Sequence, residues 1–240
     1  TNLLLLRDVL GMAPFREGLA GTWLLKEYAY SAPTFEILSP GTQTTVQDYP
    51  GRLGYWAVGV PPSGPMDAYS FQLANRIVGN APEAPGLEMT LSGASLRFNT
   101  DALFALTGGD FPATLNGKEI FRNVPLRAAK GDVLKVGTTR CGQRCYFAVA
   151  GGIDVPEYLG SRSTFTLGRF GGHGGRALAA GDVLHIGNWQ VSEPLSPAAG
   201  AVPPIGNSWK IAVLYGPHGA PDYFTDEDIE EFFRAEWEVH

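Results

Sequence analysis

The sequence predicts a mainly β fold made of short strands with few helices. It holds 31 glycines and 18 prolines, about a fifth of the 240 residues, and these residues form turns and end strands. Short apolar runs recur along the chain, each bounded by Gly, Pro, Asn or Asp. The pair Asn116-Gly117 is typical of a two-residue hairpin, because a type I′ turn needs a positive φ at both central positions.

The predicted strands start at Phe35 and are only three to six residues long, which is shorter than most helices. They are 35–38, 54–58, 95–98, 102–107, 120–122, 133–136, 145–150, 183–186 and 210–215.

Two later stretches have helical spacing and caps. The first is 67–80, with Asp67 at its N-cap and Gly79 at its C-cap. The second is 225–237, where Thr225 is the N-cap and acidic residues fill the first turn.

The first 30 residues differ from the rest. Leu3, Leu6 and Leu10 have helical spacing, and Thr1 or Asn2 can cap the helix. An apolar stripe of this kind needs a partner surface, and no nearby segment supplies one. We therefore expect a short helical segment before the β domain.

Composition excludes several classes of function. The net charge of −6 and the absence of a Lys/Arg cluster argue against a nucleic-acid partner. No apolar run reaches the ~18 residues of a membrane span, and a basic signal-peptide start is absent, which favours the cytoplasm. Cys141 and Cys145 are too few for a structural zinc site, so a reduced pair is expected, and the scattered histidines predict no metal site.

One internal similarity links 128–137 (AAKGDVLKVG) with 179–187 (AAGDVLHIG). In both, a Gly-Asp turn leads into alternating apolar residues. Either two similar hairpins lie in one barrel, or a common turn-and-strand pattern has recurred by coincidence.

Residues 44–71 (TTVQDYPGRLGYWAVGVPPSGPMDAYSF) surround a few polar groups with turn-formers. Pro50 and Gly51 can form a type II turn that folds Arg52 back towards Asp48. The pair is then either a structural ion pair or part of a site. Prolines before Ser63 and Met66 reduce the entropy lost on ordering, as a preorganised binding loop or a stable turn requires.

Two strands are predicted to end in glycine pairs, at Gly108-Gly109 and at Gly151-Gly152. Paired glycines let backbone N–H groups approach a ligand oxygen without a Cβ in the way. After the second pair comes Arg162-Ser163-Thr164, where a guanidinium between two hydroxyls could bind a carboxylate or carbonyl oxygen. No nucleophile elbow, metal-binding helix, phosphate loop or dinucleotide motif is present. Any chemistry would therefore depend on positioning and polar stabilisation.

Several longer segments resemble a known family. They are GTQTTVQDYPGRLGYWAVGVPPSGPMDAYSFQLANRIVGN, LEMTLSGASLRF, ALTGGDFPATLNG, AVAGGIDVPEYLGSRSTFTLGRFGGHGGRALAAGD and LYGPHGAPDYFT. They are similar to the carboxyltransferase domain of urea carboxylases, which is part of urea amidolyases, and to the KipA family of 5-oxoprolinase subunits. Residues 35–240 would form this domain, and residues 1–34 resemble the tail of an upstream biotin carboxylase domain.

The resemblance implies cyclophilin-like β-barrel lobes and transfer of a carboxyl group from carboxybiotin to urea, giving allophanate. It implies biotin on a separate carrier domain, with ATP and magnesium used by the upstream carboxylase domain and not by this chain. The implied partners are those two domains of the same polypeptide and a second carboxyltransferase half. Because the chain stops at EEFFRAEWEVH, before that half, we expect the isolated chain to be inactive.

Site roles are assigned to the motif segments as hypotheses. Asp48, Asp67 or Asp110 is the expected base that takes a proton from the attacking amine. Amides of the two glycine pairs are expected to polarise the ureido oxygen. The expected contacts of substrate and carboxybiotin also include a set of side chains, namely Gln47, Arg52, Ser63, Met66, Asn75, Glu88, Arg162, Ser163 and Thr164.

Three alternatives stay open at this point. Guanidine could replace urea as the acceptor with the same chemistry. The chain could belong to a 5-oxoprolinase assembly, or it could be a binding module that regulates a partner.

Overall fold

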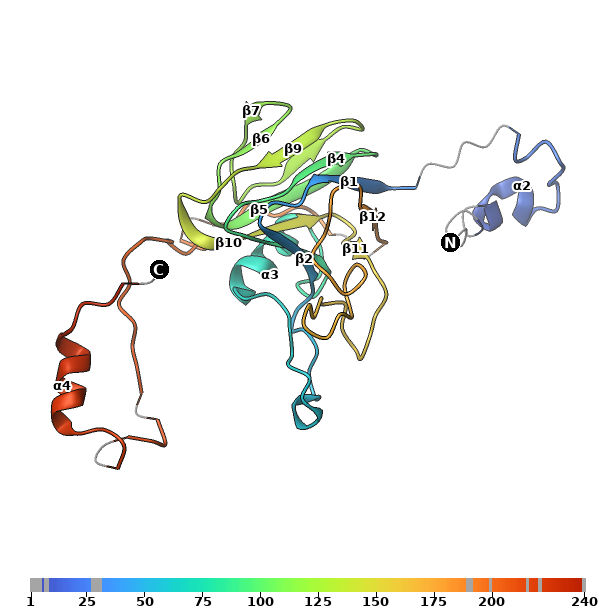
Figure 1. Ribbon diagram of the computed structural model, residues 1–240. Coiled ribbons are helices and arrows are strands. Elements are labelled where there is room, and N and C mark those ends of the chain that lie inside the picture. Colours follow the sequence, from blue (N-terminus) through green and yellow to red (C-terminus); the bar gives the residue numbers. More distant parts are fainter. Residues whose placement is uncertain are drawn as a thin grey trace. The chain divides into compact units, whose positions relative to one another are not determined.

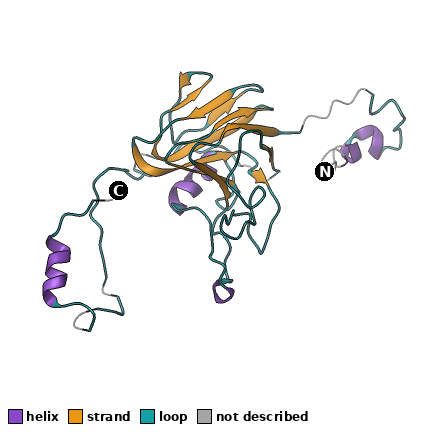
Figure 2. Ribbon diagram, viewed as in Figure 1, coloured by secondary structure: helices purple, strands orange, loops and turns teal. Residues whose placement is uncertain are grey.

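The structure is a computed structural model that describes residues 6, 9–26, 32–188, 192–198, 200–214, 216–219 and 222–238. It divides into two compact units, Thr1–Gly206 and Asn207–His240. Figure 1 labels the elements along the chain, and Figure 2 shows that strands dominate the first unit. The mainly β prediction is confirmed.

Two antiparallel sheets make up the β structure. In spatial order, the seven-stranded sheet contains β11 (Ile153–Asp154), β12 (Val183–Ile186), β1 (Thr34–Ser39), β4 (Ser95–Phe98), β9 (Val133–Val136), β6 (Ala113–Leu115) and β7 (Lys118–Glu119). The five-stranded sheet contains β2 (Gln43–Gln47), β3 (Gly86–Thr90), β10 (Cys141–Val149), β5 (Ala102–Asp110) and β8 (Leu126–Ala128).

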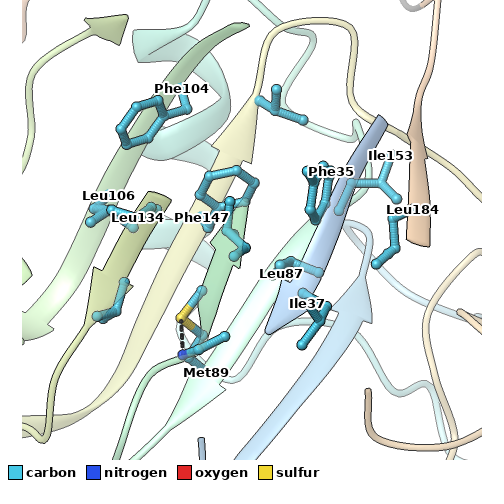
Figure 3. Packing of buried hydrophobic residues seen from close by; sticks show 14 of the residues in the cluster. Phe35, Ile37, Leu87, Met89, Phe104, Leu106, Leu134, Phe147, Ile153 and Leu184 are labelled. Atoms are coloured by element: carbon cyan, nitrogen blue, oxygen red, sulfur yellow. Dashed lines mark hydrogen bonds between the residues drawn. The ribbon is translucent and has the colours of Figure 1, made fainter. Parts of the chain in front are cut away.

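The main core lies between the two sheets, and both contribute buried apolar side chains to it. Phe147 of β10 is central (Figure 3), with ring centroids 5.6 Å from Phe35 and 5.8 Å from Phe104. Phe98 of β4 lies 6.3 Å from the same ring. Aromatic pairs at such spacings add to the area that they bury, so this core fixes how the sheets face each other.

Helix α3 (Ala68–Ile77) packs on the outer face of the five-stranded sheet and forms a second apolar cluster there. The prediction of this helix is confirmed. Asp67 is its N-cap and accepts a hydrogen bond from the Ser70 N–H. Val78 is the C-cap, and Gly79 follows it with φ +81°, so the predicted C-cap is one residue late. The N-terminus of α3 meets the buried Tyr146 of β10, whose Oη accepts from the Asp67 N–H at 2.7 Å.

The similar segments 128–137 and 179–187 form the same local structure. In each, a Gly with positive φ precedes an Asp whose Oδ2 accepts a backbone N–H three residues back, at 2.8 Å in the first and 2.7 Å in the second. The turns lead into β9 and β12, which flank the central pair β1–β4. The expectation of two hairpins is wrong, because each strand pairs with one distant in sequence.

Other local predictions had mixed outcomes. Asn116 and Gly117 form the expected hairpin between β6 and β7, both with positive φ. Residues 54–58 contain a 3-10 turn, η1 (Trp56–Val58), where a strand was predicted. Neither 120–122 nor the described part of 210–215 is a strand.

The predicted strands did not include β2, β3, β8 and β11, and β6 and β7 were implied only by the Asn116-Gly117 hairpin. The β2 sequence, QTTVQ, is polar, yet four of its five residues are buried. Its pairing with β3 provides burial that local hydrophobicity does not predict.

The remaining helices are short. Leu6 and residues 9–11 are helical, and α2 (Ala13–Arg16) follows with a proline in its first turn, while Leu3 lies outside the described residues. In the second unit, α4 (Asp226–Arg234) has the predicted Thr225 cap, completed into a capping box by Asp228. Among the described residues, no helix is long and apolar enough to cross a membrane.

Candidate functional site

A short loop before α3, residues 63–67, is held by side chains of three adjacent strands of the five-stranded sheet. We call it the anchored loop. Its backbone N–H groups donate three hydrogen bonds, from Gly64 to Gln47 Oε1 (3.1 Å), from Met66 to Glu88 Oε2 (2.7 Å) and from Asp67 to Tyr146 Oη (2.7 Å). The acceptors come from β2, β3 and β10, which are neighbours in the sheet. The sheet therefore fixes the path of the loop.

Glu88 and Tyr146 are direct cross-strand neighbours, and Tyr146 Oη donates to Glu88 Oε2 at 3.0 Å. Arg144 Nε lies 3.5 Å from Glu88 Oε1, and only 12% of the Glu88 side chain is exposed. Burial raises the pKa of Tyr146, and the Glu88 carboxylate raises it further. Tyr146 thus stays protonated, donating to Glu88 while it accepts from Asp67.

Asp48 is a buried structural anchor. Its Oδ1 accepts from the hydroxyls of Ser161 (2.6 Å) and Ser163 (2.5 Å), and its Oδ2 accepts from the Arg162 N–H (2.7 Å). The Asp48 N–H in turn donates to Ser163 Oγ at 3.0 Å. These bonds join the end of β2 to residues 161–163, so the Asp48 carboxylate has little capacity left for a substrate proton.

Arg52 has no exposed surface. Its guanidinium donates to the carbonyl oxygens of Tyr158 (3.0 Å) and Ser163 (2.9 Å) and lies 4.8 Å from the centre of the Phe170 ring. Burial lowers the pKa of Arg52, while the nearby Asp48 charge acts in the opposite direction. Arg52 therefore stabilises the 158–170 segment through its carbonyl and ring contacts, and its charge interacts with that of Asp48. Because the side chain is fully buried, it is not accessible to a ligand.

Ser63 begins the anchored loop with φ +57°, which is uncommon for a residue with a Cβ. Its hydroxyl is buried and has no hydrogen-bond partner among the described residues. Asp67 ends the loop, and both its carboxylate oxygens accept from Ser70, from N at 3.0 Å and from Oγ at 2.5 Å. Unlike these polar groups, the Met66 side chain is 71% exposed.

The Gly108-Gly109 pair lies in β5, one strand from Tyr146. Its two carbonyl oxygens accept from Arg122 Nη1 at 2.8 and 2.6 Å, and Arg122 Nη2 bonds Asp110 Oδ1 at 3.0 Å. The Asp110 side chain is 42% exposed. At this end of β5, the two glycine carbonyls are therefore occupied by the Arg122 guanidinium, and the Asp110 carboxylate is the accessible group.

The Gly151-Gly152 pair lies elsewhere, and both of its N–H groups are bonded within the protein. Gly151 N–H donates to Asn80 Oδ1 at 2.9 Å, and Gly152 N–H donates to the Val149 carbonyl at 2.9 Å. Asn75 belongs to the same buried network, since its Oδ1 accepts from Asn80 and its Nδ2 donates to the Ala84 carbonyl. Neither the N–H groups of this pair nor the side-chain amide of Asn75 is free to bind a ligand.

The residues after the second glycine pair serve mainly as structural contacts. Arg162 pairs with Glu157 at 3.1 Å and donates to the Val155 carbonyl. Thr164 donates to the Val46 carbonyl through both its hydroxyl and its N–H, each at 2.9 Å. Together with the contacts of Asp48, they attach residues 161–164 to β2.

The structure thus brings most of the predicted residues together around β2, β3 and β10, whereas Gly108, Gly109 and Asp110 lie at the end of β5 that pairs with the start of β10. The anchored loop, Gln47, Glu88 and Asp48 with its serine partners form one connected set. Sequence reasoning missed Tyr146 and Arg144, which alternate along β10 and so share one face of the sheet. A separate cavity of about 510 Å³ lies where β5 begins, lined by Asp101, Arg127 and other residues, and none of the predicted site residues lines it.

Comparison with known proteins places this set in a family context. The profile of the carboxyltransferase domain, subdomain A and B, matches residues 58–240. The chain belongs to this family. The matched range includes the anchored loop, α3 and every strand of the five-stranded sheet except β2.

Individual relatives of this carboxyltransferase domain are also similar. A urea amidolyase of Lachancea kluyveri is 49% identical over 251 aligned residues that include the whole chain, and a 5-oxoprolinase subunit of Escherichia coli is 37% identical over 85% of the chain. The crystal structure of the Kluyveromyces lactis urea carboxylase aligns with the whole chain at 46% identity and a TM-score of 0.88. The chain spans 14% of the amidolyase, 64% of the oxoprolinase subunit and 22% of the carboxylase.

Proposed function

We propose that the chain is the carboxyltransferase part of a biotin-dependent urea carboxylase, which moves a carboxyl group from carboxybiotin to urea and gives allophanate. The observation that carries this proposal is the 49% identity to a urea amidolyase across the whole chain. That match includes residues 1–34, which supports their assignment to an upstream biotin carboxylase domain. The proposed partners are that domain, a biotin carrier domain and a second carboxyltransferase half, in the cytoplasm.

Carboxybiotin would supply the carboxyl group, and the residues of this chain must bind its ureido oxygen and the acceptor. The Gly151-Gly152 amides do not fit this role, because both already donate within the protein. Arg122 and Arg144 fit better. Both side chains are partly exposed, at 26% and 23%, although the Arg144 Nε atom itself is buried beside Glu88. Each can donate a charge-assisted hydrogen bond to a carbonyl oxygen.

A base must also take a proton from the acceptor nitrogen. Of the three acids, Asp48 and Asp67 have both carboxylate oxygens occupied by hydrogen bonds within the protein. Asp110 has the more accessible carboxylate and sits beside Arg122. We therefore assign the base role to Asp110 and structural roles to the other two.

The test uses the full-length protein with ATP, magnesium and bicarbonate, and it measures carboxylated product from urea and from guanidine separately by mass spectrometry. Product from urea supports the proposal, and product from guanidine alone would move it to that acceptor. Asp110→Asn should lower the turnover at least tenfold, whereas Asp154→Asn, an exposed control on β11, should not. Near-normal turnover of Asp110→Asn would refute the base assignment.

The match to the Escherichia coli 5-oxoprolinase component supports a second candidate, an accessory role in the ring opening of 5-oxoproline. ATP-dependent consumption of 5-oxoproline, with neither urea nor guanidine carboxylated, would favour that candidate.

A further inference from the structure

The anchored loop combines three features that make it a preformed surface. It begins at a strained residue, Ser63, whose positive φ costs energy unless the surroundings impose it. It contains Pro65 and follows Pro61 and Pro62, which limit the conformations of the free chain. Three of its five residues have their N–H groups bound to side chains from three strands.

Glu88 and Tyr146 provide two of these three bonds and are bonded to each other. Glu88 Oε2 accepts from both Met66 N–H and Tyr146 Oη–H, so one oxygen holds the loop and the tyrosine together. Tyr146 Oη accepts from Asp67 N–H at 2.7 Å. The Tyr146 ring is held independently of its hydroxyl, because it packs edge-on against Phe71 of α3 with centroids 5.9 Å apart.

We propose that Tyr146 and Glu88 are positioning residues for carboxyl transfer, which fix the backbone of the anchored loop and the start of α3 so that the ureido ring of carboxybiotin or the small amide acceptor meets a preformed surface. This inference rests on the proposed function. Neither residue is assigned a role in proton transfer. Tyr146 Oη and Glu88 Oε2 are bonded to each other and to the loop, and Glu88 Oε1 lies 3.5 Å from Arg144 Nε. Their contribution is to the geometry of the loop, which is fixed before substrate binds.

The decisive variant is Tyr146→Phe, which removes the hydroxyl and keeps the ring against Phe71. The Asp67 N–H then loses its acceptor and Glu88 loses one donor. In the full-length protein, we expect kcat for carboxyl transfer to urea to fall about tenfold, because small displacements of a positioned group reduce rates strongly. ATP cleavage in the absence of urea and the KM for bicarbonate should not change.

A second measurement follows the loop itself. Hydrogen–deuterium exchange of peptides covering residues 60–70 should show about tenfold faster exchange at Met66 and Asp67 in Tyr146→Phe. The matched control is Tyr69→Phe, which also removes one hydroxyl hydrogen bond, to the Ala201 carbonyl at 2.6 Å, but touches no loop amide. This control should leave both kcat and loop exchange unchanged.

A third variant, Glu88→Gln, keeps the side-chain shape and removes the charge. Combined with Tyr146→Phe, it should lower kcat by less than the product of the two single effects, since both act through the same loop. Unchanged loop exchange in Tyr146→Phe overturns the proposal, as does unchanged kcat when exchange is faster. If the wild-type protein carboxylates neither urea nor guanidine, the proposed function fails, and the exchange data alone then decide whether the two residues fix the loop.

Discussion

Replacing Asp48 by Asn separates a structural carboxylate from a catalytic one. The Asp48 carboxylate is buried and accepts three hydrogen bonds, two from serine hydroxyls and one from the Arg162 N–H. In Asp48→Asn, the side-chain oxygen can still accept from Ser161 and Ser163, but the side-chain NH2 group would face the Arg162 N–H, which is also a donor. One charge-assisted bond, worth about 1.5–3 kcal/mol, is lost and one N–H is left unpaired, so we expect destabilisation of about 2–4 kcal/mol.

Equilibrium unfolding in guanidinium chloride, followed by tryptophan fluorescence, gives this free energy. Hydrogen–deuterium exchange should also rise in residues 158–165, which Asp48 joins to β2. The control is Asp101→Asn, an exposed carboxylate that accepts one backbone bond from Lys130 and should change stability by less than about 1 kcal/mol. An Asp48→Asn protein of unchanged stability and unchanged exchange in 158–165, but without activity, would refute the structural role.

Three further outcomes are expected. Phe147→Ala should destabilise the fold by about 3–5 kcal/mol because it empties the centre of the core, and Phe147→Leu should cost clearly less; a loss below about 1 kcal/mol for Ala would contradict the packing. Arg176 lowers the pKa of Asp182 to about 2. The contribution of ionised Asp182 to the stability of the fold is therefore complete above the pKa of about 4 that Asp has in the unfolded chain, and it is lost as the pH falls towards 2. Unfolding between pH 5 and 2 should therefore depend less on pH in Asp182→Asn, and identical pH profiles would count against the pair. Burial raises the pKa of Cys145 to about 12, so iodoacetamide at pH 8 should label the partly exposed Cys141 first, as peptide mass spectrometry would show; early labelling of Cys145 would contradict its burial.

Features set by nearby residues were predictable from the sequence. The N-cap of α3, the Asn116-Gly117 hairpin and the two Gly-Asp turns each depend on a few consecutive residues. The run at 54–58 misled because its apolar residues suggest a strand, whereas Gly54 and Gly59, with positive φ, turn the chain around η1. Local pattern alone therefore predicted the class of the fold but not every strand.

The candidate site was predictable only in part, because its contacts are long-range. Asp48 meets Ser163 across 115 positions, and Tyr146 meets Asp67 across 79. The sequence pointed to residues 44–71 as one region, and the structure joins Gln47 to the anchored loop within it. It could not show that the amides of the Gly151-Gly152 pair are already bonded within the protein, or that Tyr146 belongs to the region, since both depend on which strands become neighbours.

The bonding of the anchored loop also sets when it can form during synthesis. Its three acceptors are at positions 47, 88 and 146, and the segment before it is joined to residues 161–163. When a ribosome has released this sequence only as far as residue 100, two of these acceptors are present, and β10, which lies between β3 and β5, is not yet synthesised. The nascent loop therefore has no fixed path until residues 146–163 have emerged, and truncations that end before residue 146 should leave it open to proteases.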